Sequence, residues 1–407
     1  MRASIAASIA VFTVAGCSAT VAGRPIKAAA RVGGNGVDVA LLDPGNYPTK
    51  PKPPFGVAGD ATKGARVEAR RMADNVVGPW EVDPALSGSE QFDTGVQMDP
   101  AAWLNAPIGD DVAQHNFVTA FSSGRYAETG PHKGLSHTVL RFASPQDASA
   151  AAADMASKSG ALTITPDEPP VPTTPIPIPR HPDTPAVFHD YNSEDLANNV
   201  KEVHHEVIAI TAHGPYVFYQ WSWSAESADT ATQMVATTLD LQGPLIDQFK
   251  PTPVEQLPGL PIDPGGLFAR TLPPPKGDET INDGVLTAQG ILHFEGNPVR
   301  AQALFKSAGL QQVGYNILTY VYQTPDAASA DRVLGMLVDD QAHTKDVGAP
   351  GVKGMPAAKC FRTPKNPALL QAFVCMATAG RYAFWIQAEH EAEAHQETAA
   401  QYLMLTK

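Results

Sequence analysis

The chain has few cysteines, few positive charges and none of the common cofactor motifs. Three of its 407 residues are cysteine, and 29 lysines and arginines stand against 42 aspartates and glutamates. The phosphate-binding patterns G-x-x-x-x-G-K-[ST] and G-x-G-x-x-G are absent, as is the paired-cysteine pattern C-x-x-C. The sequence therefore gives no argument for a nucleotide, dinucleotide or structural zinc site, and we expect no cofactor and no metal.

The shortage of positive charge is uneven along the chain. The formal net charge is −13, yet residues 18–71 carry nine cations and four anions, so the remainder is strongly acidic. An acidic body argues against binding to nucleic acid, which needs basic patches to replace phosphate counterions. A basic segment beside it suits an anionic membrane surface. A solvated linker whose charge is incidental explains the segment equally well.

The first seventeen residues have the layout of a secretory signal. Arg2 precedes a short apolar stretch, which ends in the small residues Val14-Ala15-Gly16 directly before Cys17. The stretch is too short to cross a bilayer as a helix. A cysteine at this position resembles the lipobox of bacterial lipoproteins, in which a peptidase cuts before the cysteine. The thiol and the new amine of that cysteine then receive acyl chains such as palmitate.

This resemblance implies a location and an anchor. Residues 1–16 would be a signal peptide, and Cys17 would be the lipidated residue. The protein would then lie at the extracytoplasmic face of the cell membrane, with the membrane as its partner through the lipid. An ordinary cleaved signal followed by a chance cysteine is the alternative.

The two remaining cysteines predict a disulfide. After Cys17 only Cys360 and Cys375 are left, and an even pair in an exported chain favours a bridge. Strand-like residues surround each cysteine and turn-forming prolines lie between them, so a hairpin would bring the two to bridging distance. Redox-active thiols are the alternative, which the missing C-x-x-C spacing disfavours.

The body repeats one order of elements: strand, helix, hairpin, final helix. The first copy is expected near residues 138–142, 144–158, 206–221 and 227–240, and the second near 318–322, 324 onward, 373–386 and 393–405. Ser144 and Pro145 mark a helix start, and Pro325 aligns with Pro145. The pattern predicts an α+β fold with two related domains, each an antiparallel sheet covered by helices.

Composition shifts set the expected boundaries. We predict a flexible tether at 17–59, an N-terminal α+β domain at 60–243, a proline-rich linker at 244–275 and a C-terminal α+β domain at 276–407. A helix is expected from Ala61 to Val77, ended by Gly78-Pro79. The first copy also contains a proline-rich insertion at 166–185. We predict that this insertion is a surface loop; a spacer or a partner-binding strip are the alternatives.

Most of the mature chain resembles a group of uncharacterised lipoproteins from mycobacteria and related actinobacteria. The residues that carry the resemblance are Met72-Ala73-Asp74, the run from Val76 to Pro84, and Gly380-Arg381-Tyr382 after Cys375. It implies an envelope protein with a duplicated domain. It brings no reaction and no catalytic residues.

The polar motifs are weak. The segment around Ser136 resembles the start of the nucleophile elbow G-x-S-x-G, but Thr138 occupies the position of the last glycine. A serine within a strand is therefore the better interpretation. His390 and His395 are five residues apart, which is about 140° around a helix, so they do not share a face. His204-His205 would face opposite sides of a strand. We therefore commit to no catalytic residue.

Aromatic strand residues are the best candidates for binding a ligand. They are Tyr216, Phe218, Tyr219, Trp221 and Trp223 in the first copy and Trp385 in the second. Alternation along the strand puts Tyr219, Trp221 and Trp223 on one face and Tyr216 and Phe218 on the other. Core packing explains aromatics on both faces; an apolar groove for a lipid, glycan or peptide is the functional alternative.

These observations together predict a membrane-anchored cell-envelope lipoprotein. We expect it to be non-catalytic and to bind an apolar ligand or an envelope protein, and not nucleic acid. An envelope hydrolase with an unrecognised site is one alternative. A structural or assembly lipoprotein, with the proline-rich insertion as its contact, is the other.

Overall fold

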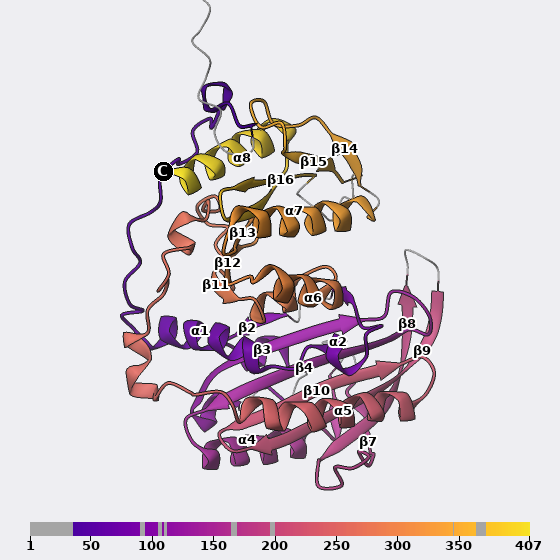
Figure 1. The fold of residues 1–407 in the computed structure, drawn as a ribbon. Coiled ribbons are helices and arrows are strands. Elements are labelled where there is room, and N and C mark those ends of the chain that lie inside the picture. The colour runs from indigo at the N-terminus through magenta and orange to yellow at the C-terminus, as the bar shows by residue number, and fades with distance from the viewer. Residues whose placement is uncertain are drawn as a thin grey trace, which may run out of the picture.

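Each half of the chain contains one antiparallel sheet with helices on its faces (Figure 1). The computed structural model describes residues 36–89, 94–104, 108–109, 112–163, 169–195, 200–344, 346–363 and 372–407. The predicted signal peptide and Cys17 lie outside these residues. The α+β class with two domains is confirmed.

The N-terminal sheet has the strand order β1-β3-β4-β10-β9-β8-β7, with β2 also paired to β3. Its strands are β1 (Gly88–Ser89), β2 (Gly95–Gln97), β3 (Phe117–Tyr126), β4 (Lys133–Phe142), β7 (Thr174–Pro175), β8 (Ala186–Asp195), β9 (Val200–His213) and β10 (Tyr216–Ser224). Helix α4 (Pro145–Lys158) packs on the face that presents Val217 and Tyr219. Helices α1 (Ala61–Met72) and α5 (Ala228–Ile246) pack on the opposite face, against Phe218. A separate two-stranded sheet pairs β5 (Ala161–Leu162), which precedes the proline-rich insertion, with β6 (Val171–Pro172), which lies within it.

The C-terminal sheet has the order β11-β12-β13-β17-β16-β15-β14. Its strands are β11 (Gly284–Thr287), β12 (Gln312–Asn316), β13 (Thr319–Gln323), β14 (Val347–Ala349), β15 (Lys359–Arg362), β16 (Phe373–Ala379) and β17 (Tyr382–Ala388). Helix α7 (Ala327–Ala342) packs on one face through Val333, together with α6 (Pro298–Ala308). Helix α8 (Glu391–Thr406) packs on the other face through Ala400 and Met404.

The repeated order predicted from the sequence is present in both halves. It is β4-α4-β9-β10-α5 in the first and β13-α7-β16-β17-α8 in the second. Gly214 (φ 55°) and Gly380 (φ 57°) occupy the same place in the two hairpins, in the left-handed region that glycine adopts without steric cost. The helix starts differ. Ser144 caps α4 with Pro145 in its first turn, whereas Asp326 caps α7 and leaves Pro325 outside the helix.

The helix that the sequence predicts at residues 61–77 is shorter in the structure. Helix α1 ends at Met72 and continues as a 3-10 turn, η3 (Ala73–Asn75), because Val76 adopts an extended conformation. Asp60 caps its start by accepting a hydrogen bond from the Lys63 amide at 2.8 Å. Pro79 then begins the short helix α2 (Pro79–Val82).

Described parts of the expected tether and of the expected linker pack against the C-terminal and the N-terminal domain, respectively. Val37, in the expected tether, is 2% exposed in a cluster with Met355, and the Asp38 amide donates to the Gly354 carbonyl at 2.8 Å. In the expected linker 244–275, α5 continues to Ile246 and the Thr252 amide donates to the buried Glu68 carboxylate at 2.7 Å. The path of residues 36–59 follows the side of the molecule (Figure 1).

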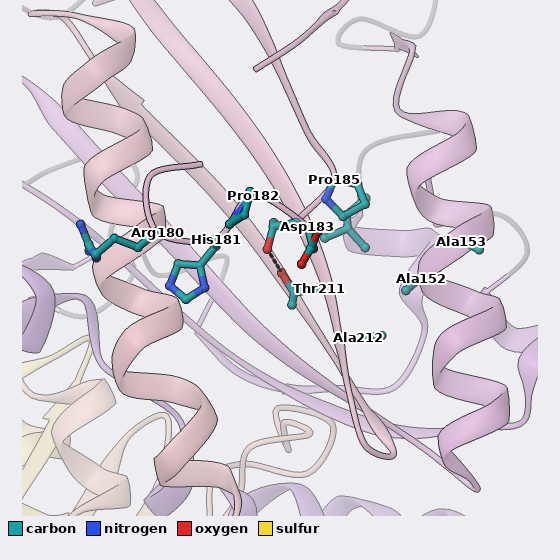
Figure 2. A pocket seen from close by; sticks show the side chains of 11 residues that line it. Ala152, Ala153, Arg180, His181, Pro182, Asp183, Pro185, Thr211 and Ala212 are labelled. Carbon is teal, nitrogen blue, oxygen red and sulfur yellow. Dashed lines mark hydrogen bonds between the residues drawn. The ribbon is translucent and has the colours of Figure 1, made fainter. Parts of the chain in front are cut away.

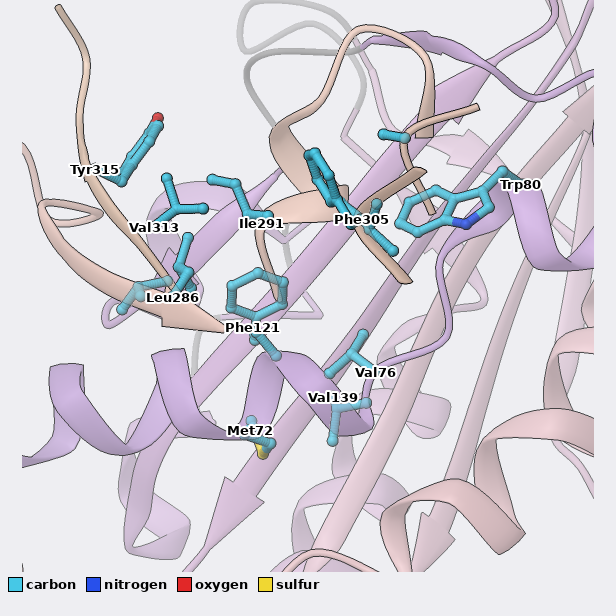
Figure 3. Close-up of a cluster of buried hydrophobic side chains, with 14 of the residues drawn as sticks. Met72, Val76, Trp80, Phe121, Val139, Leu286, Ile291, Phe305, Val313 and Tyr315 are labelled. Atoms are coloured by element: carbon cyan, nitrogen blue, oxygen red, sulfur yellow. The ribbon is translucent and has the colours of Figure 1, made fainter. Parts of the chain in front are cut away.

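The two domains share one continuous apolar core. Met72 and Phe121 from the first half and Leu286, Ile291 and Phe305 from the second belong to the same buried cluster (Figure 3). Burying apolar side chains from both halves removes them from water, which ties the stability of one domain to that of the other.

Arg125 crosses this interface. Its side chain is 1% exposed, and Nη2 donates to the carbonyl oxygens of His293 and Glu295, each at 2.7 Å. His293 is also buried: Nε2 donates to the Ala73 carbonyl at 3.0 Å and Nδ1 accepts from the Ser123 hydroxyl at 2.8 Å. Burial lowers the pKa of His293 to about 3, so the ring is neutral and can make both bonds.

Across the residues that the structure describes, we find no helix with both the length and the apolar character needed to cross a membrane.

Candidate ligand-binding site

A pocket of about 160 Å³ lies on the N-terminal sheet, on the same face as α4. We call it the Tyr219–Trp221 pocket. It is lined by Gln97, Trp103, Ser122, Ser136, Thr138, Tyr219 and Trp221. Two of the aromatic candidates from the sequence therefore meet here, together with the serine of the weak elbow motif.

Strand register explains why these side chains meet. Trp221 of β10 pairs directly with Ser136 of β4, and Tyr219 pairs with Thr138. Thr138 in turn pairs with Ser122 of β3. Directly paired residues of antiparallel strands point to the same face, so three neighbouring strands place hydroxyls and aromatic rings side by side. Gln97 of β2 and Trp103, from the short helix α3 (Pro100–Trp103), complete the walls.

The described lining combines aromatic and polar side chains and contains no charged residue. The Ser122 and Thr138 hydroxyls are 2.8 Å apart and hydrogen-bonded. The indole nitrogen Nε1 of Trp103 is buried and has no hydrogen-bond partner among the described residues. Hydroxyls both donate and accept, whereas an indole N–H only donates. The pocket therefore offers groups that can hydrogen-bond to a ligand in both senses.

The carboxylate beside Trp221 is already bonded. Trp221 Nε1 donates to Glu206 Oε2 at 3.0 Å, and His189 Nε2 lies 3.3 Å from the same oxygen. Glu206 is 6% exposed and His189 is 5% exposed. The carboxylate therefore holds the Trp221 ring from behind the pocket wall and is not part of the described lining.

Among the described residues, no base is hydrogen-bonded to Ser136. In the part of the chain that the structure describes, no hydrogen bond joins Ser136 to a histidine. His137 points to the other face, where Nε2 is 2.8 Å from Gln242 Oε1, and burial lowers its pKa to about 4. His189 shares the face of Ser136 but stands three strand spacings away, which is roughly 14 Å.

The other four candidate aromatics lie in packed surroundings. Tyr216 and Phe218 are buried on the α5 side of the sheet, and burial raises the pKa of Tyr216 to about 12. Trp223 stacks on His204 with ring centroids 4.0 Å apart. Trp385 lies 4.4 Å from the ring of Tyr320 in the core shared by the two domains. The structure does not bring these four into the Tyr219–Trp221 pocket.

Sequence reasoning missed four lining residues: Gln97, Trp103, Ser122 and Thr138. A signal for Thr138 existed, because Ser136 and Thr138 alternate with period two as Tyr219 and Trp221 do. Gln97 and Trp103 carry no comparable local pattern. Their place depends on β2 pairing with β3, which no single stretch of sequence indicates.

A larger pocket of about 440 Å³ lies at the end of the same sheet (Figure 2). It opens between α4, the last residues of β9 and the turn that closes the proline-rich insertion. Arg180 and His181 of that turn are bound to Asp240 of α5, at 2.7 Å and 2.8 Å. The Thr184 and Thr211 hydroxyls are 3.2 Å apart. Arg180 and His181 thus fasten the insertion to the domain.

The predicted disulfide is confirmed. Cys360 and Cys375 are directly paired on β15 and β16, with Cα atoms 4.1 Å apart, and are bonded. His395 places a ring nitrogen within 4.8 Å of both sulfurs. Its Nε2 donates to the Pro350 carbonyl at 2.9 Å. Since both sulfurs are joined to each other, neither is a thiolate that could bind a metal.

Comparison with known proteins places the chain in a two-domain family. A family model described as the N-terminal domain of unknown function DUF7373 matches residues 55–262, and its C-terminal counterpart matches residues 267–407. The chain belongs to the DUF7373 family. The matches join at the proline-rich segment, as the duplicated architecture requires.

Other comparisons add little. No curated protein matches the chain. The extracellular domain of PknH from Mycobacterium tuberculosis is similar to 42% of this chain over 94% of its own length, with 13% identity and a TM-score of 0.30. A likeness of this size supports no conclusion about function.

Proposed function

We propose that this protein is a cell-envelope lipoprotein, held at the membrane by acylated Cys17, that binds an uncharged ligand in the Tyr219–Trp221 pocket without transforming it. The observation that carries the proposal is the pocket lining, which combines three aromatic rings, one of them a tyrosine, with three serine and threonine hydroxyls and an amide. Ligand sites are commonly concave, with apolar walls and a few placed polar groups.

The extracytoplasmic location is supported from two sides. Residues 1–17 have the layout of a lipoprotein signal, as the sequence alone indicates. The bond between Cys360 and Cys375 suits an oxidising compartment, where disulfides form and persist. The two observations are independent, because one lies at the beginning of the chain and the other in the C-terminal domain.

Binding is favoured over catalysis by what faces the ligand. Serine-dependent hydrolysis needs a histidine within hydrogen-bond reach of the nucleophile. Glycoside hydrolysis usually needs two carboxyl groups that flank the bond to be cut. The described lining of the pocket contains neither a histidine nor a carboxylate.

Native mass spectrometry tests the binding proposal. The mature chain carrying Cys17→Ser would be secreted from an actinobacterial host, and we expect a co-purifying mass that disappears on denaturation. Trp221→Ala should lose this mass, and Asp183→Ala, in the larger pocket, should keep it. An adduct that survives Trp221→Ala, or a clean apo mass for the parent protein, would contradict the proposal.

Membrane fractionation tests the anchor. Cys17→Ser should move the protein from the membrane fraction to the soluble fraction, since one or two acyl chains supply the attachment. Unchanged retention in the membrane would contradict lipid anchoring and leave the binding proposal standing.

A further inference from the structure

We infer that the ligand of the Tyr219–Trp221 pocket is a neutral pyranose, that is, one sugar ring without a charged substituent. This inference rests on the proposed function and names its ligand class. The pyranose can be a free sugar or the terminal unit of a glycan, because both present the same ring. Four properties of the pocket support it: its aromatic walls, its hydrogen-bonding groups, its lack of charge and its size.

The aromatic walls suit the faces of a sugar ring. Tyr219 and Trp221 come from β10 and Trp103 comes from α3, so the rings reach the pocket from two elements. A pyranose presents a patch of C–H groups on its faces and hydroxyls around its rim. Aromatic side chains provide flat, rigid and amphipathic contact area that matches the C–H patch.

The hydrogen-bonding groups suit the rim of the ring. Ser122, Ser136 and Thr138 offer hydroxyls that can donate or accept, and Gln97 adds an amide. Sugar hydroxyls likewise donate and accept.

The absence of charge disfavours other ligands. A phosphate or carboxylate would meet no arginine or lysine in the described lining. An acyl chain would cover the Ser136 hydroxyl without offering it a hydrogen-bond partner, which is unfavourable for a buried polar group. A peptide that adds a strand needs a free sheet edge, and β4 is paired on both sides, with β3 and β10.

The size restricts the ligand to one ring. A volume of about 160 Å³ corresponds to roughly five water molecules. Sites for drug-sized ligands are larger, at about 300 Å³ or more. A single pyranose with its hydroxyls is of this size, and a second linked ring would have to lie outside the pocket.

Ligand-observed NMR on the secreted mature chain carrying Cys17→Ser tests the inference. The probes are neutral hexoses (glucose, galactose and mannose), glucuronic acid, a short-chain phospholipid and a tetrapeptide. We expect a neutral hexose to bind, and glucuronic acid to bind at least about tenfold more weakly. A disaccharide ending in the bound hexose should bind as well as the free sugar if the pocket takes a glycan end, and more weakly if it takes the free sugar.

Variants connect the signal to the pocket. Trp221→Ala should weaken hexose binding at least about tenfold, as expected for a central aromatic contact. Trp221→Phe, which keeps a ring, should weaken it less, so that loss of folding is not mistaken for loss of contact. Asp183→Ala should leave hexose binding unchanged, and thermal unfolding would verify that each variant is folded.

The outcomes separate this inference from the proposed function. Binding of phospholipid or peptide that depends on Trp221, without hexose binding, would overturn the pyranose and keep a ligand-binding pocket. Equal binding of hexose and glucuronic acid, or hexose binding that survives Trp221→Ala, would also overturn the inference. If no probe binds and native mass spectrometry finds no adduct, both proposals fail.

Discussion

Glu295 is a carboxyl group buried where the two domains meet, and it should make stability depend on pH. Glu295 comes directly after the 3-10 turn η7 (Gly290–Phe294). Its Oε1 accepts a hydrogen bond from the Tyr322 hydroxyl at 2.9 Å. The residue is 6% exposed. Burial disfavours the charged form and raises the pKa of Glu295 from 4.5 to about 7, although the Tyr322 hydroxyl opposes the change.

The direction of the effect follows from proton binding. Between pH 4.5 and 7 the folded protein holds a proton on Glu295 that the unfolded chain has released. The stability contributed by this group is therefore complete below pH 4.5 and is lost as the pH rises through 7. The difference between the two pKa values corresponds to about 3 kcal/mol in the free energy of unfolding.

Buried histidines act in the opposite direction. Burial lowers the pKa of His293 to about 3 and that of His137 to about 4, from 6.5. For these groups stability is lost as the pH falls through the folded-state values. The pH dependence of the wild-type protein alone thus mixes both effects. The difference between wild type and Glu295→Gln isolates the carboxyl, since glutamine does not titrate.

Urea denaturation at several pH values tests this reasoning. The free energy of unfolding of Glu295→Gln minus that of wild type should increase by about 3 kcal/mol between pH 4.5 and 8. Glu255→Gln, at an exposed position of η5 (Val254–Gly259), makes the same substitution on the surface and is the control variant. A difference for Glu295→Gln that is also constant over this range would refute a carboxyl titrating inside the fold.

Three further variants address the interface, the disulfide and the hairpin turns. Arg125→Ala should lower the free energy of unfolding by about 3 kcal/mol or more, because the carbonyls of His293 and Glu295 lose their donor in a buried place; a loss below about 1 kcal/mol in urea denaturation would contradict the role of Arg125 in joining the domains. Replacing Cys360 and Cys375 together by alanine should cost about 3 kcal/mol, and alkylation of the unfolded Cys17→Ser chain should find no free thiol. Gly214→Ala should cost about 1 kcal/mol from backbone strain alone, since nothing lies within 4 Å of the added Cβ. Gly160→Ala, equally open but without a positive φ, is its control and should not show this loss in thermal unfolding.

The repeated architecture was predictable because each copy carries strong local signals. Alternating residues mark β9 and β10, glycine marks their turn, and a serine-proline pair marks the start of α4. Such signals act over a few residues, so one sequence is sufficient to read them. The pairing of Cys360 with Cys375 was predictable for the same reason, since both lie in neighbouring strands of one short segment.

The candidate site was only partly predictable because it depends on pairing between distant strands. The aromatic alternation pointed to Tyr219 and Trp221, but also to Trp223 and Trp385, which pack against His204 and Tyr320. Local pattern cannot distinguish a ring in a pocket from a ring in a core, because both are apolar and alternate alike. What separates them is the neighbouring strand, and β3 and β4 lie far from β10 in sequence.

The same limit applies to the connecting segments. Proline-rich composition predicted a linker at residues 244–275, and the segment contains 3-10 turns. Composition did not indicate that Glu68 would bind the Thr252 amide, or that Val37 would pack beside Met355. Irregular backbone can be firmly bound when its polar groups find partners on another element.

The packing of residues 37–47 has a consequence for the order of folding. Val37 and Asp38 contact the region of Met355, and the Tyr47 hydroxyl is hydrogen-bonded to Glu397 of α8. The C-terminal domain thus contains residues from both ends of the described chain, and the N-terminal domain lies between these ends in the sequence (Figure 1). Contacts between distant residues form late, since a long loop must close first. Residues 37–47 are synthesised early, whereas Met355 and Glu397, which they contact, are made late, so we expect this segment to dock late in folding.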